Sequence, residues 1–117
     1  MPEIELVSER ITIDHLHALA RSQFGDFVKA VVDIGRGVMA VGGELHADEE
    51  AVLLDAGSAQ ADLWGINLYP DAFPTESWIE FDSMINVRPG QSNQTRGIED
   101  AERRHAIRAT VDRLVAQ

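Results

Sequence analysis

Residues 78–87, Trp-Ile-Glu-Phe-Asp-Ser-Met-Ile-Asn-Val, carry the clearest structural signal in this chain. Apolar residues occupy four of the five positions on one parity of this stretch, and successive side chains of a strand point to opposite faces. The pattern predicts a strand with one core face and one polar face, which carries Glu80 and Asp82. Because a Gly-containing polar loop follows at 89–97, we expect a functional surface on the polar face of strand 78–88 and on this loop.

The remainder of the chain alternates between strand-like and helix-like segments. Two valine-rich runs flank Gly35-Arg36-Gly37, so a hairpin is predicted over residues 27–41. Thr12 and Asp100 are suited to cap helices, since their side-chain oxygens can accept otherwise unpaired backbone amides. Alternating or helical spacing of apolar residues predicts these further elements: strands at 3–7 and 64–69, and helices at 13–24, 48–56 and 101–115.

This order of elements favours an α+β fold with a mostly antiparallel sheet of four or five strands. About three helices would pack on one face, leaving the other face partly solvated, which suits the polar side of strand 78–88. The 117 residues and the 44% hydrophobic content are those of a single domain, 1–117, with a core of its own. The sequence leaves open whether Trp64 and Trp78 belong to the core or to an interface.

Composition excludes several classes of function. The chain has no cysteine, which excludes disulfides, thiolate catalysis and cysteine-ligated metals. The net charge is −10, with one lysine among ten basic residues, so binding to nucleic acid is not expected. No apolar run reaches the length of about 20 residues that spans a membrane, and no signal sequence is recognised, which predicts a cytoplasmic protein.

A divalent-metal site is one candidate. Glu44 and His46 share a parity if the second hairpin strand extends that far. A carboxylate of Asp48, Glu49, Glu80 or Asp82 could complete a set of ligands that suits zinc or manganese. In the alternative, which we favour, His46 is only hydrogen-bonded near a helix start. Asp48 and Glu49 then complement the helix dipole.

A second candidate is a polar cluster built around the neighbouring carboxylates of Glu80 and Asp82. Like charges this close raise the pKa of one partner, which is how general acids arise, so these two residues and His46 are the catalytic candidates. The residues expected to bind a ligand come from the adjacent strand and the following loop: Asn67, Tyr69, Asn86, Arg88, Asn93 and Arg96. The favoured alternative is a solvated sheet face with cross-strand ion pairs, followed by a loop whose side chains hold its backbone.

The chain also resembles a small prokaryotic family of single-domain proteins of unknown function. The resemblance extends over about residues 12–115 and supplies no activity or catalytic residue. It rests on these motifs: Gly43-Glu44-Leu45-His46-Ala47-Asp48, Leu63-Trp64-Gly65-Ile66-Asn67, and Ile85-Asn86-Val87-Arg88-Pro89.

Together these features favour a binding or interaction module that uses strand 78–88 and loop 89–97. Its expected partner is another protein or a second copy of the chain. The alternative is a hydrolase or nuclease-like enzyme that depends on a divalent metal held by Glu44, His46 and Glu80 or Asp82.

Overall fold

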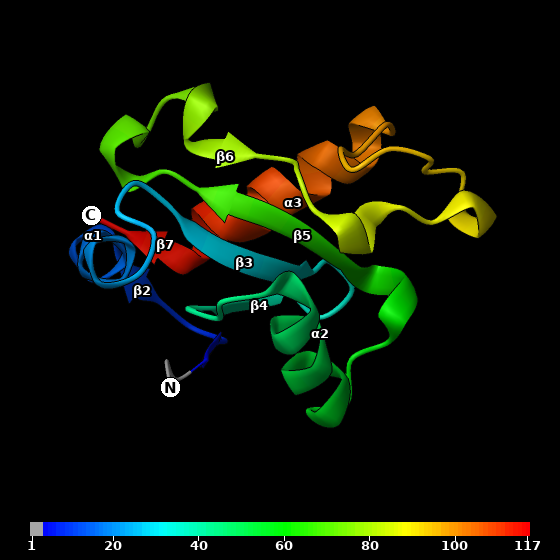
Figure 1. The fold of residues 1–117 in the computed structure, drawn as a ribbon, viewed down its shortest axis with the longest axis horizontal. Coiled ribbons are helices and arrows are strands. Elements are labelled where there is room, and N and C mark those ends of the chain that lie inside the picture. Colours follow the sequence, from blue (N-terminus) through cyan, green and yellow to red (C-terminus); the bar gives the residue numbers. More distant parts are fainter. Residues whose placement is uncertain (1–3) are drawn as a thin grey trace.

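Five strands form one antiparallel sheet in the order β1-β4-β3-β5-β6 in the computed structural model, which describes residues 4–117 (Figure 1). The strands are β1 (Glu5–Val7), β3 (Val28–Asp33), β4 (Val38–Val41), β5 (Leu63–Leu68) and β6 (Ile79–Glu80). A second, parallel pair joins β2 (Ile11–Thr12) to β7 (Val115–Ala116). The predicted α+β class and the antiparallel sheet are confirmed, whereas the short β2–β7 pair has no counterpart in the sequence analysis.

Three α-helices cover the sheet, namely α1 (Ile13–Ser22), α2 (His46–Asp55) and α3 (Ala101–Leu114). Buried residues of α1 and α3 share one core with one face of the sheet, and Leu53 of α2 belongs to a separate core on the opposite face. Figure 1 shows α2 in front of the sheet and α3 behind it. The prediction that the helices share one face is therefore wrong for α2. Strands β3 and β5 explain this, because they are almost entirely buried and need cover on both faces.

Local signals placed most element ends correctly. The Thr12 hydroxyl accepts the His15 amide at 3.1 Å and begins α1, and the Asp100 carboxylate accepts the Glu102 amide at 3.1 Å and begins α3. The tight turn after β3 is held by Asp33, whose carboxylate accepts the amides of the two residues that follow Ile34 at 2.9 Å each. Between residues 4 and 117 the remaining elements are five short 3-10 helices: Gln60–Asp62, Pro70–Ala72, Glu76–Trp78, Met84–Asn86 and Pro89–Gln91.

The predicted strand over 78–87 is wrong beyond Glu80. Only Ile79 and Glu80 pair with β5, and the chain then turns into the 3-10 helix Met84–Asn86. The side-chain amide of Asn86 explains the turn, since it accepts the Gly65 amide at 2.8 Å and donates to the Gly65 carbonyl at 2.9 Å. It thereby forms the two bonds to β5 that the backbone of a longer β6 would otherwise form.

Both tryptophans belong to the core, because Trp64 is 0% exposed and Trp78 is 2% exposed. Trp78 packs edge-on against Phe73, with ring centroids 4.9 Å apart. Over residues 4–117, none of the helices combines the length and the apolar character needed to cross a membrane.

Candidate functional site

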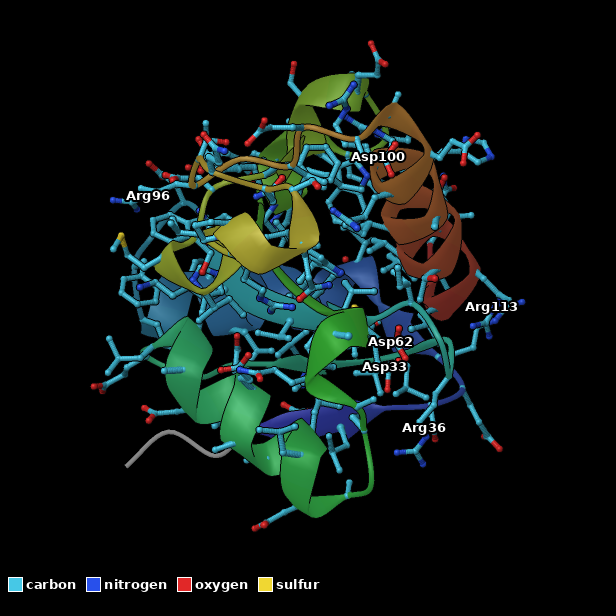
Figure 2. The ribbon with its side chains drawn as sticks, turned by 90° about the vertical axis from the view of Figure 1, so that its right-hand side faces the viewer. Asp33, Arg36, Asp62, Arg96, Asp100 and Arg113 are labelled. Carbon is cyan, nitrogen blue, oxygen red and sulfur yellow. The ribbon has the colours of Figure 1, made fainter. Side chains whose placement is uncertain are left out.

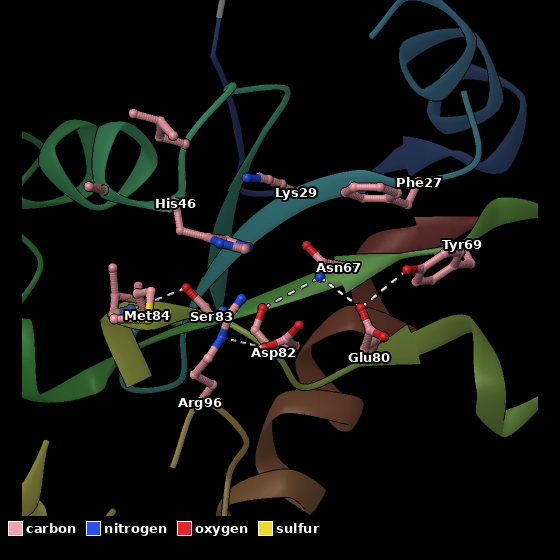
Figure 3. A pocket seen from close by; sticks show the side chains of 13 residues that line it. Phe27, Lys29, His46, Asn67, Tyr69, Glu80, Asp82, Ser83, Met84 and Arg96 are labelled. Atoms are coloured by element: carbon pink, nitrogen blue, oxygen red, sulfur yellow. Dashed lines mark hydrogen bonds and ion pairs between the residues drawn. The ribbon is translucent and has the colours of Figure 1, made fainter. Parts of the chain in front are cut away.

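A polar pocket lies on the face of the sheet that α2 covers at only one end. Leu53 of α2 packs with Val31, Ala40 and Leu63. The other end of the same face stays open and forms a pocket of about 480 Å³. Figure 3 shows the side chains that line it. The sheet, the start of α2 and the segment after β6 supply the polar ones: Lys29, His46, Asn67, Tyr69, Glu80, Asp82, Ser83 and Arg96.

A row of three side chains crosses the floor of this pocket. Lys29 on β3 is the cross-strand partner of Asn67 on β5, and Asn67 is in turn the partner of Glu80 on β6. The Asn67 amide nitrogen donates to the Glu80 carboxylate at 2.8 Å and to the Asp82 carbonyl at 3.4 Å. Because these bonds fix the orientation of the amide, its oxygen Oδ1 must point away from both acids.

The Asn67 Oδ1 atom is buried and accepts no hydrogen bond from any part of the chain between residues 4 and 117. Asn67 as a whole is only 7% exposed. In Figure 3 this oxygen points into the pocket, toward the side where Lys29 and His46 lie. A buried acceptor without a donor costs roughly 1–3 kcal/mol, so a donor brought by a ligand would remove a penalty that the folded chain carries.

His46, the first residue of α2, forms one wall. Its Nε2 lies 2.8 Å from the Ile66 carbonyl, which can only accept, so Nε2 carries the hydrogen. Burial lowers the pKa of His46, although the bond to Ile66 opposes this. The imidazole is therefore neutral near pH 7, with its lone pair on Nδ1. Gly65 makes room for this arrangement, since a Cβ there would lie 2.5 Å from the Cβ of Ser83 and 3.2 Å from the His46 ring.

The acids of the pocket each have their own partner. Asp82 Oδ1 accepts from Arg96 Nε at 2.8 Å, and Glu80 Oε1 accepts from the Tyr69 hydroxyl at 3.2 Å. Partial burial, followed by the Glu80 carboxylate, raises the pKa of Tyr69, so the hydroxyl remains a donor. Asn67 and Tyr69 lie on the same face as the two acids, and both donate to the Glu80 carboxylate.

Large exposed apolar side chains stand beside the polar floor. Leu45 is 56% exposed and Met84 is 66% exposed, and both line the pocket. On the β3 side, the ring centroids of Phe27 and Tyr69 lie 5.5 Å apart, which gives the pocket an aromatic wall. A ligand can thus contact apolar surface while its polar groups reach the floor.

The structure does not assemble the predicted metal site. Strand β4 ends at Val41, and the exposed Glu44 lines a neighbouring hollow beside Phe24 rather than the pocket that holds His46. Within residues 4–117, no three His, Asp or Glu side chains are grouped so that they could hold a metal ion. The geometry therefore does not support a metal held by Glu44, His46 and Asp82.

Three predicted binding residues have structural roles instead. Asn86 and Asn93 are fully buried. The Asn93 amide donates to the carbonyls of Asn86 at 2.7 Å and Gly97 at 2.8 Å, and so holds the loop together. Arg88 lies outside the pocket, where its guanidinium packs 4.4 Å from the Trp64 ring and donates to backbone carbonyls. Of the predicted loop residues, only Arg96 lines the pocket.

Glu49 also differs from its predicted role as a helix-dipole complement. It is 0% exposed, and its Oε2 accepts the Gly43 amide at 2.9 Å, while Oε1 has no partner among residues 4–117. Burial raises the pKa of Glu49 to about 9, although the bond from Gly43 opposes this shift. Glu49 is therefore a protonated core residue near pH 7.

Other charged groups serve the fold at the opposite side of the molecule. Figure 2 shows Arg36, Asp62 and Arg113 far from Arg96, near the β3–β4 turn. Arg113 donates to the Gly37 carbonyl at 2.6 Å and so ties α3 to this turn.

A further hollow runs along β1 and β2 beside His15.

Lys29 and Ser83 also line the pocket, although neither was predicted from the sequence as a site residue. A signal for Lys29 existed, since it is the one charged residue inside the apolar run 28–32 of a central strand. A charge is rarely placed in such a strand unless it reaches solvent or a partner. Ser83 interrupts the apolar parity of 79–87 for a similar reason, because it lies at the back of the pocket.

These features define a small α+β domain with a polar pocket on one face of its sheet. The chain belongs to a family of proteins of unknown function, DUF5674, whose model matches residues 5–114. This confirms the resemblance to a family without an assigned activity. A search of curated proteins and a search of solved structures each gave no match.

Proposed function

We propose that this chain is a binding domain whose ligand lies in the pocket over Lys29, Asn67 and Glu80. The observation that carries the proposal is the Asn67 Oδ1 atom, a buried acceptor that points into the pocket and lacks a donor within residues 4–117. Such a group is satisfied most simply by a hydrogen-bond donor that enters from outside. The proposed functional surface is therefore the sheet face formed by Lys29, Asn67 and Glu80. It lies beside the surface predicted from the sequence, strand 78–88 and loop 89–97.

The rim of the pocket supports the related proposal that a protein partner, or a second copy of the chain, covers this site. Leu45 and Met84 are long, exposed and adjacent to polar groups, a combination that is typical of the centre of an interface. Light scattering of the wild type and of Met84→Ser tests self-association. A dimer that the substitution weakens supports it, and a monomer at all concentrations restricts the partner to another molecule.

A titration of isotope-labelled protein, followed by two-dimensional NMR of the backbone amides, tests the ligand site. Methylammonium and acetamide supply donors, and acetone, which only accepts, is the matched control probe. We expect the two donors to shift the amides of Asn67 and Glu80, whereas acetone, which can accept only from the Lys29 ammonium, does not. The hollow near His15 is an internal control. No shift at the pocket with either donor, or shifts only near His15, would overturn the proposal.

A further inference from the structure

The charges on the pocket floor are ordered, and their order specifies a type of ligand. Lys29, Asn67 and Glu80 lie on three adjacent strands, so a cation, a neutral acceptor and an anion follow one another across the sheet. Adjacent strands are about 4.8 Å apart, which places the Lys29 and Glu80 backbones about 10 Å from each other. A ligand with a single charge would find an attractive group at one end of this row and a repulsive one at the other.

A dipolar ligand avoids this conflict. We infer that the pocket binds an α-amino acid group, as a free amino acid or as the first residue of a peptide, with its ammonium toward Asn67 Oδ1 and Glu80 and its carboxylate or carbonyl oxygen toward Lys29. This inference rests on the proposed function and names the class of ligand. The ammonium supplies the donor that the Asn67 oxygen lacks.

The walls favour an apolar side chain on that ligand. Phe27, Tyr69, Leu45 and Met84 all line the pocket, and Figure 3 shows Phe27 and Tyr69 on the opposite side from Met84. A volume of about 480 Å³ exceeds what one amino acid fills, so the first residue of a peptide also fits. Asp82 is paired with Arg96 at 2.8 Å and leaves the Glu80 carboxylate as the nearer counter-ion for an ammonium on the floor.

Four related probes test the inference in the same NMR titration. L-Leucine has both charges, 3-methylbutylamine lacks the carboxylate, N-acetyl-L-leucine lacks the ammonium, and L-leucinamide replaces the carboxylate with the carbonyl of a peptide. We expect the amine and the acetylated acid to bind about tenfold more weakly than leucine, the effect of losing one hydrogen-bonded charge. If L-leucinamide binds with an affinity equal to or higher than that of L-leucine, the ligand is a peptide N-terminus. If its affinity is lower, the ligand is the free amino acid.

Two variants assign the charges. Glu80→Gln should weaken the binding of leucine and 3-methylbutylamine but not that of N-acetyl-L-leucine, whose carboxylate it no longer repels. Lys29→Gln should weaken the binding of leucine and N-acetyl-L-leucine but not that of the amine. A substitution that merely disturbed the fold would weaken all probes alike, and the amide spectrum of each variant reports its fold. Glu44→Gln, at the exposed neighbouring hollow, is the matched control and should change nothing.

The outcomes separate the two proposals. If 3-methylbutylamine binds as tightly as leucine, or if either variant weakens all four probes equally, the inference fails while the pocket remains a donor-binding site. If neither leucine nor its relatives shift the amides of the pocket, the inference fails too, and the titration with methylammonium and acetamide then decides the proposed function by itself.

Discussion

We expect the stability of this protein to decrease as the pH rises, and replacing Glu49 with glutamine should remove most of that decrease. The fully buried Glu49 has a folded pKa of about 9 against an ordinary value of 4.5. Because the folded pKa is raised, the contribution of this group is fully present below the unfolded pKa. It is lost as the pH rises toward the folded value. In this window the folded chain holds a proton that the unfolded chain releases.

The magnitude follows from the linkage between proton binding and folding. Each pH unit inside the window lowers the free energy of unfolding by about 1.4 kcal/mol. At pH 7 the loss amounts to about 3 kcal/mol, a large share of the roughly 5–15 kcal/mol of a typical domain. The glutamine oxygen can still accept the Gly43 amide. The glutamine NH₂ takes the place of Oε1, which has no hydrogen-bond partner within residues 4–117 in the wild type. The substitution therefore changes mainly the titration.

Urea unfolding between about pH 5 and pH 8, followed by fluorescence of the buried Trp64 and Trp78, measures the effect. Between these two pH values the free energy of unfolding should fall by about 4 kcal/mol more in the wild type than in Glu49→Gln. Asp48→Asn, which removes an exposed charge from the same helical turn, is the matched control. It should change the free energy of unfolding by a few tenths of a kcal/mol and leave its pH dependence as in the wild type. Equal slopes for wild type and Glu49→Gln would refute the assignment of a buried, protonated carboxyl.

Two further substitutions test the packing around the site. Gly65→Ala should lower the free energy of unfolding by about 1–3 kcal/mol, because its Cβ would lie 2.5 Å from the Ser83 Cβ, whereas Gly90→Ala meets nothing within 4 Å. Calorimetry of both variants checks this, and an equal melting temperature would contradict it. Asn93→Ala should cost at least about 2 kcal/mol, since the buried Asn93 amide donates to the carbonyls of Asn86, Thr95 and Gly97. Denaturation in urea measures this loss, and a cost within a few tenths of a kcal/mol would show that the loop does not depend on that amide.

Most of the fold could be predicted from the sequence because its signals are local. The hairpin around Gly35-Arg36-Gly37 and the caps at Thr12 and Asp100 depend on residues within a few positions of one another. Such patterns specify elements without knowledge of the tertiary structure. The face on which α2 packs depends instead on the burial of β3 and β5 from both sides, which the periodicity of α2 itself does not record.

The candidate site could be predicted only in part. Glu80, Asp82, Asn67 and Tyr69 all line the pocket, although only Asn67 and Glu80 lie in paired strands. The alternation that placed Asn86 on the same polar face is misleading, because a side-chain amide bonded to Gly65 ends the strand. Contacts of this kind join residues about twenty positions apart and leave no periodic trace in the sequence.

The burial of Glu49 is a second feature that the sequence pattern did not predict. An acid in the first turn of a helix is typical of a surface residue that complements the dipole. Its burial depends on Gly43, where a Cβ would lie 2.8 Å from the Glu49 side chain. The sequence contains both residues but does not show that the glycine makes room for the acid.

A crystal structure of the protein grown with L-leucine tests the proposed ligand site most directly. We predict a ligand nitrogen within hydrogen-bond distance of Asn67 Oδ1, with the ligand carboxylate on the Lys29 side of the pocket. An empty pocket in which a donor of the protein itself binds Asn67 Oδ1 would contradict the central claim.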